Sequence, residues 1–130
     1  MREILFRGKT ISTDEWVHGG YAKMDDRHFI AVNQMYDDNT CSWGMYEVHP
    51  ESVGQYIDDT DAGGNRIFEG DIVYVPSEDE YANIFWNEDT GSFILGFDCW
   101  CGDFDHFYGH ELEIHGNTYD NKEWFENGRL

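Results

Sequence analysis

The stretch of residues 63–75 constrains the fold of this chain more than any other stretch. It opens with a glycine pair at 63–64, and a second tight turn follows around Gly70. Glycine takes positive φ at low cost, so both places favour turns. Residues 72–75 are apolar at each position, and Pro76 ends the run. A short apolar run bounded by turn residues predicts a strand covered on both faces, and therefore a protein of alternating strands and turns.

The rest of the chain continues this alternation. There are nine Phe, eight Tyr and five Trp but only four leucines, a balance that favours strands over helices. The expected strands cover residues 2–7, 15–23, 28–36, 43–48, 72–75, 82–87, 92–97 and 111–115, and residues 51–57 are expected to be a short extended segment. In the second of them, Gly19 and Gly20 predict a bulge or a close packing point. A short helix is expected at 122–126. We therefore predict an all-β single domain over residues 1–130, consistent with its length.

The charge of the chain excludes several classes of partner. Residues 51–130 hold 19 acids and three bases, a net charge of −16, whereas residues 1–50 hold eight acids and five bases, a net of −3. A chain with a total charge of −19 repels nucleic acid and anionic membranes, so direct binding to either is not expected. Its field attracts a basic protein partner or divalent cations. The alternative reading is an acidic surface that only keeps the protein soluble.

The amino-terminal sequence and the cysteines predict a cytosolic protein. No secretory segment follows Met1, and no apolar run approaches the roughly 18 residues of a membrane-spanning helix. The three cysteines are an odd number, and reduced thiols are expected in the cytosol.

The segment 98–110, from Asp98 to His110, is predicted to be an irregular loop and is the densest set of possible metal ligands. Thiolates and imidazoles suit zinc, and carboxylates could complete such a site. The spacing argues against zinc, because a Cys-x-Cys pair without a matching second pair departs from structural zinc motifs. The segment also lacks the ligand spacing of an EF-hand, which argues against a calcium site of that type. The alternative is an aromatic loop with surface acids. The candidate ligands are Cys99, Cys101, Asp103, Asp105, His106 and His110.

No other pattern indicates catalysis or a cofactor. Glu69 and Asp71 could act as an acid–base pair, but a turn lies between them. We expect Asp71 to accept hydrogen bonds from backbone amides of that turn and Glu69 to be solvated. No Ser or Cys lies in a nucleophile motif, and no glycine-rich loop precedes a helix. The chain is therefore predicted not to be an enzyme and to need no cofactor.

Three segments, taken in order, carry a resemblance that covers most of the chain. They are residues 1–7, residues 53–73 and residues 114–121. Together they resemble the YopX-like proteins of phages and prophages, whereas the segment 98–110 departs from that pattern. The positions that form the structural signature are Gly64, Glu69, Gly70, Asp71 and Asn117.

The resemblance implies a curved antiparallel sheet with the character of an SH3-like half barrel. It also implies a phage or prophage gene that is expressed in the cytoplasm of a bacterial host, and proteins that self-associate. It carries over no catalytic residues.

Three functional hypotheses follow. The first is a non-enzymatic module that binds a protein partner or forms a homo-oligomer, since open sheet edges and exposed aromatics are natural interfaces. The second is an acidic mimic of nucleic acid that occupies a DNA- or RNA-binding protein of the host. The third is a metal-binding protein that uses the loop 98–110.

Overall fold

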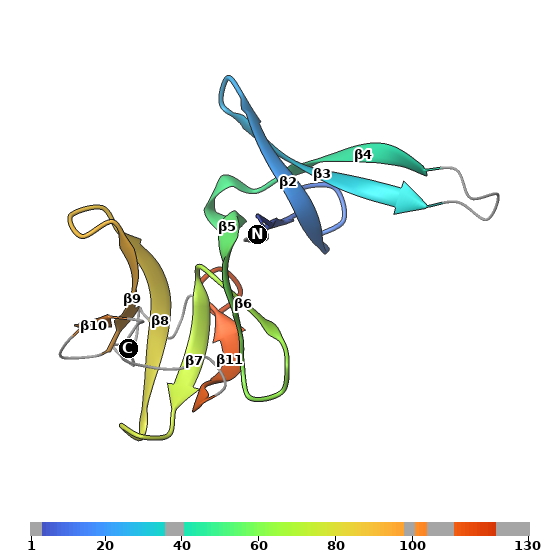
Figure 1. Ribbon diagram of the computed structural model, residues 1–130. Helices are drawn as coiled ribbons and strands as arrows, with labels where there is room; N and C mark the ends of the chain where they lie inside the picture. The colour runs from blue at the N-terminus through green and yellow to red at the C-terminus, as the bar shows by residue number, and fades with distance from the viewer. Residues whose placement is uncertain (1–3, 36–40, 98–100, 104–110, 122–130) are drawn as a thin grey trace. The chain divides into compact units, whose positions relative to one another are not determined.

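The protein is built from β-strands joined by turns (Figure 1). The computed structural model describes residues 4–35, 41–97, 101–103 and 111–121. Their strands form two antiparallel sheets. By its contacts the chain divides into two compact units, Met1–Tyr56 (unit 1) and Ile57–Leu130 (unit 2).

Unit 1 is a meander of long strands. Its elements are β1 (Phe6–Lys9), β2 (Trp16–Met24), β3 (Arg27–Met35), β4 (Cys41–Val48) and the 3₁₀ turn η1 (Pro50–Ser52). Strands that follow one another in sequence also pair in the sheet. Asp25, with a φ of 55°, forms the turn between β2 and β3, and aspartate is one of the few residues that enter this region readily. The pairing of β3 with β4 runs unbroken from His28↔Val48 to Met35↔Cys41.

β5 (Gly54–Thr60) belongs to both units. Its first residues, Gly54 and Gln55, pair with Arg7 and Phe6 of β1. Its later residues lie in unit 2, where the neighbouring strand is β6 (Arg66–Phe68). The strand order of this sheet is therefore β4-β3-β2-β1-β5-β6.

Unit 2 adds a second sheet and contains the main cluster of buried hydrophobic side chains, while Phe29, Ile30, Val48 and Tyr56 are buried in unit 1. The sheet has the order β10-β9-β8-β7-β11, formed by β7 (Asp71–Val75), β8 (Glu80–Asn87), β9 (Ser92–Gly96), β10 (Cys101–Asp103) and β11 (Glu113–Asn117). Alternate residues of β7 and β8, together with residues in and next to β9 and β11, meet β5 and β6 in one cluster of buried side chains. Its members are Ile57, Ile67, Val73, Val75, Ala82, Ile84, Leu95, Phe97 and Leu112.

The structure confirms the all-β prediction and several details of it. In β7, Ile72 and Val73 are fully buried although they point to opposite faces, as expected for a strand covered on both sides. Gly19 is a close packing point, because any side chain there would run into the backbone carbonyl oxygen of Ala31. The single-domain prediction and the SH3-like half barrel stay predictions, and the helix expected at 122–126 lies outside the described residues.

Two local expectations were wrong. Residues 51–57 were expected to be extended throughout, but the chain first makes η1, because Pro50 lacks the N–H of a sheet donor and has a φ suited to a helical turn. Residues 98–110 were expected to be an irregular loop throughout, but β10 lies within that range and pairs with β9. The local sequence of β10 has few strand-forming residues, so its pairing with β9 decides its conformation.

The turn before β7 gives the first testable prediction. Gly70 has a φ of 94°, so a β-branched side chain there costs about 1–3 kcal/mol of backbone strain. We expect Gly70→Val to lower the free energy of unfolding by that amount in urea denaturation followed by circular dichroism. Gly20→Ala is the matched control, since Gly20 has no positive φ and open space around it. Wild-type stability of Gly70→Val would contradict this account of the turn.

Candidate functional site

The proposed metal ligands are only partly in the described residues. Cys101 and Asp103 lie in β10, opposite Gly96 and Ile94 of β9, and Cys101 is an exposed free thiol. Within the described ranges, no three His, Cys, Asp or Glu residues gather closely enough to hold a metal ion. The metal hypothesis therefore stays a prediction. The other four candidate ligands lie outside the described residues: Cys99, Asp105, His106 and His110.

The turn between β6 and β7 is held by the signature residues Gly70 and Asp71. The buried carboxylate of Asp71 accepts a hydrogen bond from the backbone N–H of Phe68 at 2.7 Å, which confirms the expected turn-capping role. Gly70 donates its N–H to Ile84 of β8 and accepts from the N–H of Thr118, each at 2.7 Å. The turn thus ties three segments of unit 2 together. Glu69 beside it is half-buried, not fully solvated as expected.

Asp61 holds the other turn of the signature stretch and is only 7% exposed. Its Oδ1 atom accepts from the backbone N–H groups of Gly63 at 3.0 Å and Asn65 at 2.8 Å. Its Oδ2 atom accepts from the N–H of Ile114 at 3.2 Å, which fixes the start of β11. Burial by itself would raise the pKa of Asp61, but the hydrogen bonds from Asn65, Ile114 and Gly63 outweigh burial and lower that pKa.

Asp61 was not singled out from the sequence. The signal that could have identified it is an aspartate followed at short range by glycines and asparagine, the pattern of a side chain that bonds the backbone of its own turn.

Asn117 closes the turn that follows β11. Its Oδ1 atom accepts from the N–H groups of Tyr119 at 3.1 Å and Asp120 at 2.8 Å. The side chain of Asn121 bonds the backbone of Asn117 in turn: its Oδ1 atom accepts from the N–H of Asn117 at 3.1 Å. A side chain at Gly116 would collide with Asn121. Of the signature positions, Gly64 and Gly70 lie in turns and have positive φ, 82° and 94°. Asp71 and Asn117 lie at strand ends next to turns, and their side chains bond the backbone there.

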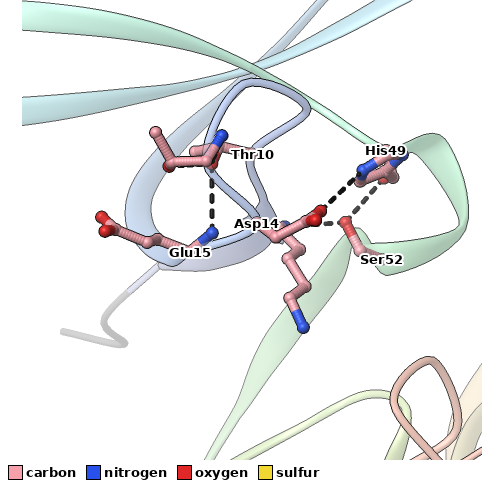
Figure 2. Close-up of polar contacts among 7 residues, drawn as sticks. Thr10, Asp14, Glu15, His49 and Ser52 are labelled. Atoms are coloured by element: carbon pink, nitrogen blue, oxygen red, sulfur yellow. Dashed lines mark hydrogen bonds and ion pairs between the residues drawn. The ribbon is translucent and has the colours of Figure 1, made fainter.

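Unit 1 has a polar junction that sequence reasoning missed (Figure 2). Thr10 is buried, its N–H donates to the carbonyl oxygen of Glu15 at 2.9 Å, and its Oγ1 atom accepts from the N–H of Glu15 at 3.2 Å. Ser52 Oγ accepts from the N–H of Lys9 at 2.8 Å. The Thr10 bonds close the turn after β1, and the Ser52 bond joins the end of β1 to η1. The same turn contacts β4 through the Ile11 N–H, which donates to the Glu47 carbonyl oxygen.

The same junction brings a serine, a histidine and an aspartate close together. The ring of His49 faces Asp14, with Nε2 3.3 Å from Oδ1 (Figure 2). Ser52 Oγ, however, donates to the backbone carbonyl oxygen of His49 at 2.6 Å and not to its ring. A catalytic serine needs its hydroxyl proton directed at the base. This arrangement therefore serves to hold the backbone.

Together these contacts define a small two-sheet β protein whose buried polar side chains hold turns and strand ends in place. The sequence model of the YopX protein family matches residues 5–126. The chain belongs to that family, as the three resembling segments indicated. No curated protein matches it. Among the described residues no helix is long and apolar enough to cross a membrane.

The bonds of Asp61 give a prediction with a defined pH dependence. The folded state lowers the pKa of Asp61, so its contribution to stability is present above the unfolded pKa of about 4 and is lost as the pH falls through the folded pKa. We expect Asp61→Asn to lower the free energy of unfolding at neutral pH by about 1–3 kcal/mol. The gap to wild type should narrow in acid. Asp58→Asn, an exposed change in β5, is the control, and an equal loss in both variants at every pH would refute this assignment.

The metal hypothesis is tested by elemental analysis and native mass spectrometry. We expect the purified protein to hold no stoichiometric zinc and to unfold at the same temperature with and without a chelator, because its ligand spacing departs from zinc motifs. One bound zinc per chain would establish the loop 98–110 as a metal centre, provided that Cys101→Ser releases it and Cys41→Ser does not.

Proposed function

We propose that the protein is a non-enzymatic binding module whose contact element is the β2–β4 sheet of unit 1, and that it binds a protein partner or a second copy of itself. Its setting is the cytoplasm of a bacterium that carries a phage or prophage. One observation supports this more than any other: the long strands of unit 1 carry exposed apolar side chains, and unit 1 contributes no residue to the hydrophobic core cluster.

The exposed apolar side chains belong to β2 and β4, the first and last strands of the β2–β4 sheet. Met24 of β2 is 54% exposed, Met45 of β4 is 50% exposed and Tyr21 of β2 is 36% exposed. The members of the core cluster all lie between residues 57 and 112, in unit 2. A sheet of three strands needs a covered hydrophobic face for independent stability. Met24 and Met45 lie on one face of the sheet and Tyr21 on the other, because side chains alternate between faces along a strand. Exposed apolar side chains on a sheet can form a contact surface, and methionine adapts well to a partner.

Of Lys, Arg, Asp and Glu, the strands β2 to β4 hold only Lys23, Arg27 and Glu47, a net charge of +1. Two arginines of unit 1 are engaged within the unit. Arg7 lies over the ring of Trp16, with 4.9 Å from guanidinium carbon to ring centroid. Arg27 bonds Glu47 at 2.8 Å, and this hydrogen bond raises the pKa of Arg27 and lowers that of Glu47. The charge presented by the sheet is therefore low. A partner would be held there by apolar contact and backbone hydrogen bonds rather than by charge attraction.

The proposal is tested by native mass spectrometry across a wide range of concentration, together with hydrogen exchange of the same samples. We expect association that buries the segment of β2 to β4, so its amides should exchange more slowly in the associated sample. Exchange in unit 2 is the internal control. A protein that stays monomeric and captures no partner, or protection confined to unit 2, would contradict the proposal.

A second candidate function is supported by the acids of unit 2. Those that the structure shows as exposed are Asp58, Glu78, Asp79, Glu80, Glu88, Asp89, Glu111, Glu113 and Asp120. Dense surface carboxylates would attract a basic nucleic-acid-binding protein of the host, as an acidic mimic does. Affinity capture from host lysate at rising salt tests this function. Salt-sensitive recovery of a basic nucleic-acid-binding protein is expected, and recovery of neutral or acidic proteins alone would exclude mimicry.

A further inference from the structure

The outer edge of β4 differs from the other sheet edges in the described residues. The two sheets end in β4 and β6, and in β10 and β11. β6 and β10 are three residues long, and β11 has a register shift between Ile114 and Gly116. Short length and bulges are the usual protections of an edge strand against pairing with another chain. β4 has eight residues, no shift in its register and no proline.

The backbone groups available at this edge can be identified from the bonds at its far end. On the side away from β3, the Glu47 carbonyl oxygen accepts from the N–H of Ile11 at 3.0 Å, and the His49 N–H donates to the Lys9 carbonyl oxygen. Backbone groups of alternate residues point to the same side of a strand. Met45 and Trp43 therefore direct their N–H and C=O groups outward, and no described residue pairs with them there.

The edge is also nearly uncharged. Residues 41–46 hold no charged side chain, and Glu47 is paired with Arg27. Unit 1 holds nine acids and five bases, a net charge of −4, whereas unit 2 holds 18 acids and three bases, a net of −15. A basic partner would be drawn to unit 2 rather than to this edge. The occupant that fits here is a neutral, unprotected strand, and in the described residues that strand is β4 itself.

We propose that β4 pairs antiparallel with β4 of a second copy, which makes one sheet continuous across a two-fold dimer. This rests on the proposed self-association and names its contact. In the register that we infer, Trp43 and Met45 exchange both hydrogen bonds with Met45 and Trp43 of the other copy. The two-fold axis then passes Gly44, where the absence of a side chain suits the close approach of a non-hydrogen-bonded pair. The half-exposed side chain of Met45 lies next to the contact and loses water on pairing.

The test uses two lysine substitutions on the same face of the sheet. Gly20 pairs with Ala31, and Ala31 pairs with Met45, so Gly20 lies on that face two strands away from the edge. Gly20 has open space for a side chain. Met45→Lys places two ammonium groups close together across the axis, whereas Gly20→Lys adds the same charge without touching the edge. Analytical ultracentrifugation gives the dissociation constant of each variant.

We expect Met45→Lys to raise the dissociation constant roughly tenfold or more, because like charges side by side disfavour association, and Gly20→Lys to leave it near that of wild type. In the wild-type protein the amide protons of Trp43 and Met45 should exchange more slowly as concentration rises, with no such change in Met45→Lys. This second measurement does not depend on the folding of a variant.

Other outcomes would overturn the edge contact. Equal weakening by both substitutions would mean that the sheet face is the interface. Unchanged association in both variants would place the contact elsewhere and leave the proposed function standing. Protection of Trp43 and Met45 only when another protein is added would make that protein the occupant. A wild-type chain that stays monomeric and captures no partner would remove the proposed function as well.

Discussion

The structure of unit 2 depends on carboxylates that replace water as the partner of backbone amides in its turns. A turn that packs against a core buries N–H groups, and each one left unpaired costs free energy comparable to a lost hydrogen bond. Asp61 supplies acceptors for three such groups, and Asp71 supplies one for Phe68. With these acceptors in place, the chain can fold back twice between residues 61 and 71 and still start β7 in the middle of the core.

This use of aspartate divides the acids of the chain into two groups. Asp61 and Asp71 are buried and bonded, so they serve the fold. The exposed acids of unit 2, such as Glu78 and Glu88, lie on the surface and give it a negative electrostatic potential. A count of charges in the sequence cannot separate the groups, because both are acids in turn-rich segments. The distinction matters for function, since only the second group can meet a basic partner.

Features of the fold that depend on adjacent residues could be predicted from the sequence, whereas features that depend on residues far apart in the chain could not. The turns around Gly64 and Gly70, and the burial of Ile72, Val73 and Val75, are specified by adjacent residues and were predicted. The bond from Ile114 to Asp61 joins residues 53 apart, and that from Lys9 to Ser52 joins residues 43 apart, so neither leaves a local signal. β10 was missed for the same reason, because it becomes a strand only beside β9. Strand order, which exposes the edge of β4, also had to come from the structure.

The charge distribution and the edges of the sheets together limit how copies of this chain can meet. A total charge of −19 opposes association, and most of it lies in unit 2, so contact is least costly at unit 1. Pairing of two β4 edges about a two-fold axis uses one edge from each copy and then closes. The remaining edges are short or bulged, so the joined sheet has no long edge to extend it among the described strands. An unprotected strand and a highly charged neighbouring unit therefore favour a closed dimer over a growing fibre.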